Sequence, residues 1–105
     1  MNAISNGLGR LAIVTVVSMT ACSNGAAVAA GEELYSEQCV ACHGANGGGE
    51  AESGYPDAPP LDNTVPGLTD EALVDLIIEG QGGMPPVPVS DDEALDIVAY
   101  LRATF

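Results

Sequence analysis

The feature that most constrains this chain is a short cysteine motif, Cys39-Val40-Ala41-Cys42-His43. It reads C-x-x-C-H, the sequence at which a c-type haem is attached. Two thiols that are separated by two residues can bond to the two vinyl groups of one porphyrin edge, and the adjoining imidazole then lies under the iron. The motif therefore predicts one covalent haem c held by Cys39 and Cys42, with His43 as an axial ligand of the iron.

Two other uses of paired cysteines fit this chain less well. A redox-active dithiol of the thioredoxin type belongs to a βαβ unit, and no β-branched run with a crossover helix surrounds Cys39. A structural zinc site needs four ligands, whereas the motif supplies three and His43 is the only histidine. We therefore keep haem attachment as the prediction.

Several further segments make residues 31–105 resemble a small class I cytochrome c. Gly31 and Tyr35 precede the motif, and Pro59-Pro60-Leu61, Gly83-Met84-Pro85-Pro86 and Val98-Ala99-Tyr100-Leu101 follow it, in the order that the family has. The resemblance implies an all-α fold, in which three to four short helices wrap one haem and the N- and C-terminal helices cross.

The same resemblance assigns roles to particular residues. Gly31 and Tyr35 are expected to pack against the C-terminal helix, beside Tyr100. The carbonyl of Pro59, or that of Pro60, is expected to accept a hydrogen bond from Nδ1 of His43, which would fix the orientation of the imidazole ring and raise its basicity.

Capping residues and apolar periodicity predict three helices in this region. The first covers residues 31–41, and the second begins after Thr69 and ends at Gly80, a residue that commonly terminates helices. A capping box marks the start of the last helix, and its buried stripe is predicted to be Ala94, Ile97, Val98, Leu101 and Phe105. Residues 44–67 are rich in Gly and Pro, so we expect an irregular loop that packs on the haem.

Elimination leaves one residue as the second axial ligand of the iron. Met1 and Met19 lie in the N-terminal segment, the chain has no second histidine and no lysine, and Met84 remains. Met84 stands between glycines and prolines, outside any helical stripe, which is poor placement for a residue that only fills the core. The alternatives are a five-coordinate iron or a weaker donor such as Asn or Tyr. The predicted pair of metal ligands is His43 and Met84, which raises the reduction potential.

Length and charge limit the remaining possibilities. A chain of 105 residues forms one small domain, and its own core would be marginal without the haem. The net charge is −13, so phosphate repulsion argues against nucleic acid as a partner. Such acidity favours a redox protein partner with a basic docking patch, a high-salt habitat, or a surface that is acidic only for solubility. An apolar docking face at Pro85-Pro86-Val87-Pro88 is the other possibility.

The N-terminus resembles a bacterial export signal. In residues 1–21, Arg10 precedes an apolar run that is too short to span a bilayer. Cys22 follows small residues, as in a lipoprotein processing site, and predicts lipidation and a membrane anchor, with residues 22–30 as a flexible tether and 31–105 as the haem domain. Cleavage near Ala27-Val28-Ala29 is the alternative, and it would release a soluble periplasmic protein.

Together these features predict a carrier of single electrons between membrane or periplasmic redox partners. With both axial positions filled, no site is open for a small-molecule substrate, so we expect no enzymatic activity. The alternatives are a haem c subunit of a periplasmic dehydrogenase complex, and a haem sensor or peroxidase-like protein in which Met84 is labile. The peroxidase interpretation lacks a distal His or Arg, because Arg102 belongs to the last helix.

Overall fold

The computed structural model describes residues 25–105, which form helices and turns, with no strand beyond one isolated bridge. A helical segment over residues 25–38 comes first. The elements that follow are α2 (Val40–His43), α3 (Glu50–Ser53), α4 (Leu61–Thr64), the 3₁₀ turn η1 (Val65–Gly67), α5 (Asp70–Glu79) and α6 (Asp91–Thr104). The all-α prediction is confirmed.

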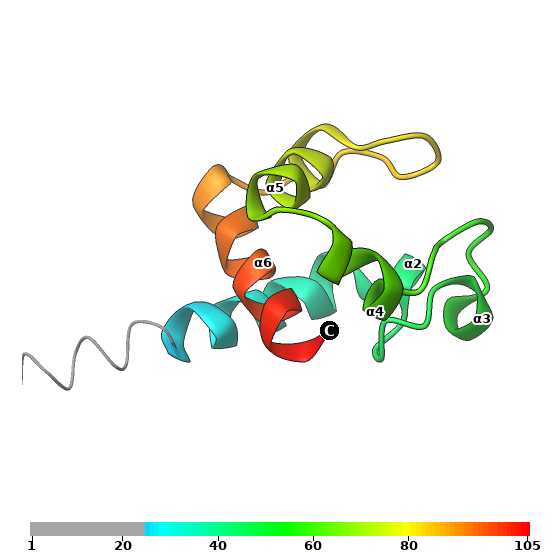
Figure 1. The fold of residues 1–105 in the computed structure, drawn as a ribbon, viewed down its shortest axis with the longest axis horizontal. Helices are drawn as coiled ribbons and strands as arrows, with labels where there is room; N and C mark the ends of the chain where they lie inside the picture. The colour runs from blue at the N-terminus through cyan, green and yellow to red at the C-terminus, as the bar shows by residue number, and fades with distance from the viewer. Residues whose placement is uncertain (1–24) are drawn as a thin grey trace, which may run out of the picture.

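The N-terminal helical segment crosses α6 in close contact (Figure 1). A Cβ placed on Gly31 would lie 2.0 Å from the carbonyl oxygen of Asp96 and 2.9 Å from Cβ of Tyr100. One turn later, the ring of Tyr35 packs against that of Tyr100 in a tilted arrangement, with a ring-centroid distance of 5.3 Å. The two helices therefore meet through a residue without a side chain and an aromatic pair, as the sequence predicted for Gly31, Tyr35 and Tyr100.

The two long helices after the motif begin at the predicted capping residues. The side chain of Thr69 accepts a hydrogen bond from the Ala72 amide at 3.1 Å, which begins α5. Ser90 and Glu93 form a reciprocal capping box at the start of α6. Four of the five predicted stripe residues of α6 are buried, and Phe105 is half-buried.

Arg102 connects α6 to the segment between α4 and α5. Its Nε donates to Asp70 Oδ1 at 2.9 Å, and Nη1 donates to the Val65 carbonyl at 2.8 Å. Nη2 donates to the Leu68 carbonyl. Two of these bonds satisfy the backbone carbonyls of Val65 and Leu68, at the start of η1 and just after it, and the third pairs with the first residue of α5.

The segment 44–67 differs from the predicted irregular loop because it contains α3, α4 and η1. Each is about one turn long, so none shows the apolar periodicity that reveals a helix in a sequence. Local bonds hold them instead: Ser53 Oγ donates to the carbonyls of Cys42 and Gly49, and the Leu61 amide donates to the Gly47 carbonyl.

The first helix also begins earlier than the predicted residue 31. Residues 25–30 are helical, so the prediction that they form a flexible tether is wrong for this stretch. The physical reason is composition, since four of these six residues are alanine, the strongest helix former. The predicted signal segment 1–21 and Cys22 lie outside the described residues. Within residues 25–105, no helix is both long and apolar enough to cross a bilayer.

Candidate haem-binding site

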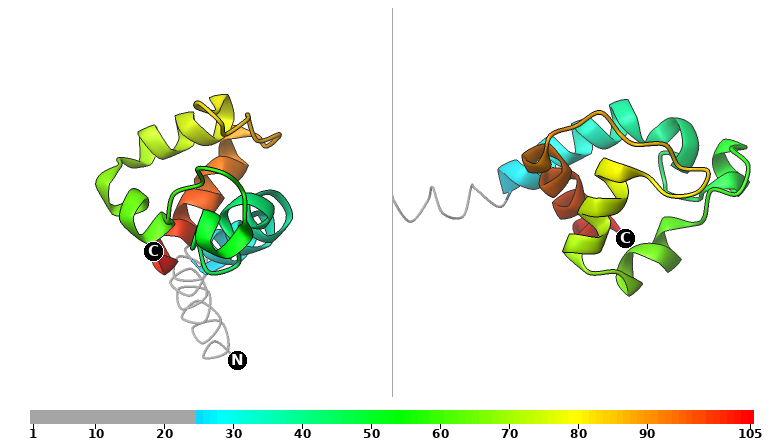
Figure 2. Two further views of the ribbon diagram at one scale, coloured as in Figure 1. Left: turned by 90° about the vertical axis from the view of Figure 1, so that its right-hand side faces the viewer. Right: turned by 90° about the horizontal axis from the view of Figure 1, so that it is seen from above.

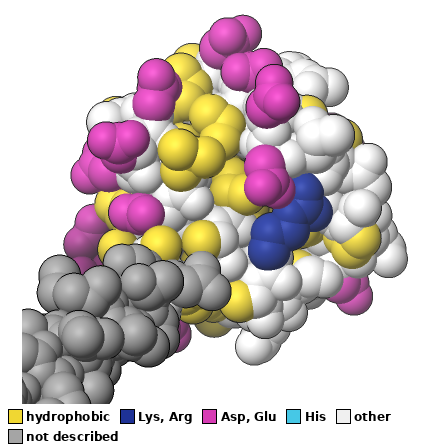
Figure 3. Space-filling view, turned by 60° about the vertical axis from the view of Figure 1, so that its left-hand side comes forward, with side chains coloured by type: hydrophobic (Ala, Val, Ile, Leu, Met, Phe, Trp, Pro, Cys, Tyr) yellow, Lys and Arg dark blue, Asp and Glu magenta, His cyan; other side chains and the backbone are white. Residues whose placement is uncertain are grey.

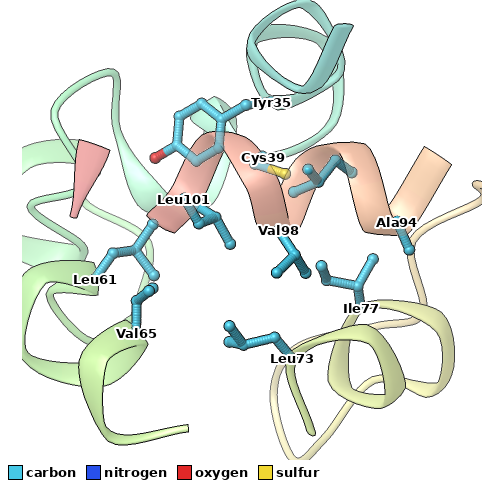
Figure 4. Close-up of a cluster of buried hydrophobic side chains, with 10 residues drawn as sticks. Tyr35, Cys39, Leu61, Val65, Leu73, Ile77, Ala94, Val98 and Leu101 are labelled. Atoms are coloured by element: carbon cyan, nitrogen blue, oxygen red, sulfur yellow. The ribbon is translucent and has the colours of Figure 1, made fainter. Parts of the chain in front are cut away.

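An apolar cavity of about 510 Å³ lies among α2, α4, η1, α5 and α6. Figure 4 shows part of its wall, with Leu61, Val65, Leu73 and Ile77 on one side and Leu101 of α6 on the other. The segment carrying α3 and the segment after α5 project toward the same end of the molecule (Figures 1 and 2), and both contribute lining residues. A cavity of this size is typical of a cofactor site.

Every predicted haem residue lines this one cavity: Cys39, Cys42, His43, Pro59 and Met84. They come from α2 and its N-terminal neighbour, the segment before α4, and the segment after α5. The structure thus brings together residues that are up to 45 positions apart, from Cys39 to Met84 (84 − 39).

The cysteine motif forms one compact helical turn. The helix over residues 25–38 breaks at Cys39, and α2 follows at once. The amide of His43 donates to the Cys39 carbonyl at 2.9 Å, so both cysteines and the histidine are carried by the same turn. Both thiols are free, with Cys39 buried and Cys42 half-buried.

Burial controls the ionisation of these side chains. It raises the pKa of the Cys39 thiol to about 11, with a smaller contribution from the neighbouring Cys42. Burial also lowers the pKa of His43, so the imidazole is neutral at pH 7. A neutral imidazole is the form that binds a metal.

The hydrogen bond expected from His43 to Pro59 does not form in this structure. Nδ1 of His43 is buried and has no hydrogen-bond partner, while the Pro59 carbonyl lies against Gly49, 2.7 Å from the position a Cβ would take there. A buried polar atom without a partner is rare in folded proteins, so Nδ1 of His43 still needs a hydrogen-bond acceptor.

Met84 is presented by a tight backbone turn. The amide of Gln81 donates to the Met84 carbonyl and the amide of Met84 donates to the Gln81 carbonyl, each at 2.9 Å. The two intervening residues are glycines, and Gly82 has a φ of +55°. The half-buried Met84 therefore lines the cavity from a defined hairpin rather than from a loose loop.

Two tyrosines also contribute in ways that the sequence did not reveal. The hydroxyl of Tyr35 donates to the carbonyl of Gly44 at 2.6 Å, directly after the cysteine motif. Tyr55 lines the cavity, and its hydroxyl donates to the Gly83 carbonyl at 3.4 Å, beside Met84. Tyr35 was predicted only as a packing residue, and Tyr55 carried no signal, because both bonds depend on the folded backbone.

This arrangement fits a haem. The wall is apolar, two thiols lie on one turn with an imidazole, and a thioether belongs to a separate segment of the same cavity. Thiols, imidazole and thioether are the groups by which proteins attach haem c and ligate its iron.

Comparison with known proteins places the chain among c-type cytochromes. Residues 26–101 match a protein family described as "Cytochrome C oxidase, cbb3-type, subunit III". The match covers the helical segment before the motif, the whole cavity wall and most of α6.

Two curated relatives are similar to a large part of this chain. Cytochrome c-551 of Bacillus subtilis (strain 168) is 42% identical over 72 residues, which are 68% of this chain and 58% of that protein. The cbb3-type cytochrome c oxidase subunit FixP of Bradyrhizobium diazoefficiens is 40% identical over 60 residues, which are 55% of this chain and 20% of FixP. The chain therefore spans only part of the length of each relative.

Proposed function

The chain belongs to the c-type cytochrome family described as cytochrome C oxidase, cbb3-type, subunit III, and we propose that it transfers single electrons with its haem iron held between His43 and Met84. Like other c-type cytochromes it carries haem c covalently, at Cys39 and Cys42. The bound haem supplies an iron that takes up and releases one electron.

The observation that carries the proposed ligation is the place of Met84. It is the only methionine in residues 25–105, and its hairpin makes it part of the cavity that His43 also lines. A thioether opposite an imidazole favours the ferrous state and so raises the reduction potential. The apolar wall excludes water from the site, which acts in the same direction because charge is disfavoured there.

The proposed ligation predicts that the protein has no enzymatic activity of its own. Two protein ligands leave the iron no open position for a substrate, so the chain itself would catalyse no reaction. In the sensor-like or peroxidase-like alternative Met84 would be labile, and the paired hydrogen bonds of its hairpin favour the opposite.

Pro59 remains the proposed acceptor for His43. It lines the same cavity, and Nδ1 of His43 is a buried donor in need of a partner. A small movement of the Pro59-Pro60 segment away from Gly49 would supply that carbonyl and orient the imidazole.

The ligation is tested by Met84→Ala in the holoprotein. We expect the haem to stay attached, the reduction potential to fall, the Met–iron charge-transfer band to vanish and the ferrous protein to bind carbon monoxide. Leu76→Ala is the control, because it removes a cavity-lining side chain of similar size without removing a donor. If Met84→Ala keeps the wild-type potential and band, the proposed ligation is wrong.

We further propose that the protein is exported and anchored in the membrane by lipid on Cys22. The support is the signal-like sequence of residues 1–21. Wild type should incorporate radioactive palmitate and sediment with membranes, whereas Cys22→Ser should do neither. A soluble form whose mass begins near Ala30 would contradict the anchor and support cleavage at Ala27-Val28-Ala29.

The surface suggests the chemistry of the partner. All 15 acidic residues fall within residues 25–105, and Arg102 is the only Arg or Lys there. Its guanidinium is already engaged by Asp70. Figure 3 shows one face, on which acidic side chains border an apolar strip. A shallow groove between α5 and α6 combines Val74 and the 52% exposed Leu95 with four carboxylates. We propose a protein partner with a basic docking patch.

A second candidate function is that of a haem subunit in a larger redox complex. The similarity to FixP, which is a subunit of a cbb3-type oxidase by name, favours it. Mild solubilisation of membranes followed by affinity purification separates the two: a stoichiometric set of partner subunits supports the complex, and a monomeric cytochrome supports the free carrier.

A further inference from the structure

Gly80, the residue that ends α5, lies against the backbone of the Met84 hairpin. A Cβ on Gly80 would be 2.6 Å from the Met84 carbonyl oxygen, 2.8 Å from the nitrogen of Pro86 and 2.9 Å from the carbonyl carbon of Pro85. All three atoms belong to the backbone, and two of these residues are prolines, so the neighbours cannot move aside as a flexible side chain could.

The hairpin is closed by its own backbone bonds, and the chain beyond it is bonded to α5. The Met84 carbonyl, which a Cβ on Gly80 would strike, is also the acceptor for the Gln81 amide at 2.9 Å. Beyond the hairpin, the Val87 amide donates to the Ile77 carbonyl in the last turn of α5, also at 2.9 Å. The segment 80–87 therefore returns onto the end of the helix it leaves, with Gly80 at the point of closest approach.

Helix termination alone does not account for this contact. Gly80 has a φ of +77°, which suits a glycine at a helix C-terminus. Gly54 ends α3 with a φ of +80°, yet a Cβ there would meet nothing within 4 Å. The two helix ends thus share a positive φ but differ in ψ, which is 173° at Gly80 and 1° at Gly54. Of the two, only Gly80 lies against the segment that carries Met84.

We propose that Gly80 is a positioning residue for Met84: its missing side chain lets the hairpin close on α5 and so sets where the thioether lies in the haem cavity. This inference rests on the proposed ligation of the iron by Met84. Any side chain at position 80 would push the Met84 backbone away from the helix and weaken or break the Met–iron bond.

Other glycines of the chain serve as controls, because they separate the clash of a Cβ with the hairpin from the strain of a side chain at positive φ. A Cβ at Gly82 or Gly83 would meet nothing within 4 Å, although both belong to the hairpin. Gly82 has positive φ, so Gly82→Ala adds backbone strain without a clash. Gly83 is not among the glycines with positive φ, so Gly83→Ala adds only a methyl group beside Met84. Gly54→Ala adds the strain of a positive φ at another helix end, where a Cβ meets nothing within 4 Å.

The test compares the holoproteins Gly80→Ala, Gly82→Ala, Gly83→Ala and Gly54→Ala with Met84→Ala. The measurements are the Met–iron charge-transfer band, the reduction potential, carbon monoxide binding by the ferrous form and the free energy of unfolding. We expect Gly80→Ala to keep the haem, to lose most of the band, to bind carbon monoxide and to shift in potential toward Met84→Ala. The three controls should keep the band, even where stability falls.

A second variant covers the case in which Gly80→Ala does not accumulate. Insertion of one glycine after Gly80 lengthens the connection between α5 and the hairpin without adding a Cβ. This variant should also lose the Met–iron charge-transfer band, and its ferrous form should bind carbon monoxide. If Gly80→Ala or the insertion keeps the band and the potential while Met84→Ala loses both, Gly80 does not position the ligand and the ligation stands. If Met84→Ala also keeps both, the ligation and this inference fail together.

Discussion

Tyr35 combines two tasks at the scale of a single residue. Its ring packs between Tyr100 and Phe105, with centroid distances of 5.3 and 6.2 Å, so it joins the N-terminal helical segment to α6. Its hydroxyl donates to the Gly44 carbonyl, the first one after His43. The residue that holds the helix crossing together therefore also fixes the end of the haem-attachment turn.

Tyr35→Phe should destabilise the protein by about 0.5–1.5 kcal/mol, because the buried Gly44 carbonyl would lose the Tyr35 hydroxyl and keep only the Gly47 amide, while the ring packing is kept. Urea unfolding of the holoprotein measures this. Tyr100→Phe is the control: its hydroxyl bonds to no other described residue, so its cost should be smaller. Equal costs for the two variants would contradict the role given to the hydroxyl.

Glu52 orders the segment that follows the haem motif. Its carboxylate accepts hydrogen bonds from the backbone amides of Asn46 and Gly48, at 3.0 and 2.9 Å. These bonds, first that from Asn46, hold the pKa of Glu52 below its ordinary value of 4.5. A lowered pKa means that the folded state prefers the carboxylate, so this contribution to stability is present above pH 4.5 and is lost as pH falls below it.

Glu52→Gln should therefore make the free energy of unfolding depend less on pH at acid pH. The wild type should lose more of its unfolding free energy than the variant as pH falls below 4.5 and the carboxylate becomes protonated. Glu79→Gln on α5 controls for the general removal of one negative charge. If the free energy of unfolding changes with pH equally in wild type and Glu52→Gln, these bonds do not stabilise the fold.

The residues that we propose to bind the haem could be named from the sequence because their chemistry is visible in the chain. Cys39, Cys42 and His43 form a motif, and Met84 is the remaining thioether, so neither depends on knowing the fold. The bonds of Tyr35 and Glu52 to backbone groups had no such signal, since any tyrosine or glutamate can make them once the backbone is placed. The acceptor for His43 was assigned to Pro59 by resemblance, and that bond is absent here.

At the scale of elements, α5 and α6 are specified locally. Each has an N-cap side chain, acidic residues in its first turn and buried residues at helical spacing, so the sequence predicted both. α3, α4 and η1 were missed because a single turn carries no periodic pattern and is held by bonds to distant backbone groups. The helical residues 25–30 were missed because alanines carry no amphipathic signal.

Ser90→Ala should cost about 1 kcal/mol of stability, because it removes the acceptor for the Glu93 amide at the start of α6. Thermal or urea unfolding gives the value. Ser36→Ala is a matched control inside a helix: the Ser36 hydroxyl bonds only to the carbonyl of the preceding turn, and alanine is the better helix former. A loss at Ser36 equal to that at Ser90 would contradict the capping role.

At the scale of the whole molecule, we propose that the acidic surface steers the approach of partners. Residues 25–105 hold 15 acidic side chains and one arginine, and Asp57 lines the haem cavity itself. A basic patch on a redox partner would be attracted to this surface over about 10 Å at 0.1 M salt, and less at higher salt. In a high-salt habitat, the same charges would instead repel one another until salt screens them.

Electron transfer to the cognate acceptor should therefore slow as ionic strength rises through about 0.1 M, if charge steers the encounter. Asp57→Asn should slow transfer at low salt and reduce the dependence on salt, whereas Asp92→Asn, at the start of α6, should do so less. Stopped-flow kinetics across a salt series measures both. A rate that is flat or rises with salt would contradict steering, and a rise together with increasing stability would favour the high-salt interpretation.

The central claim is that the chain carries one electron on an iron whose axial positions are both filled, by His43 and Met84. An optically monitored redox titration of the wild-type holoprotein tests it most directly. We predict one reversible single-electron step, a Met–iron charge-transfer band in the oxidised form and no carbon monoxide binding in the reduced form. A wild-type protein without that band whose reduced form readily binds carbon monoxide would contradict the account.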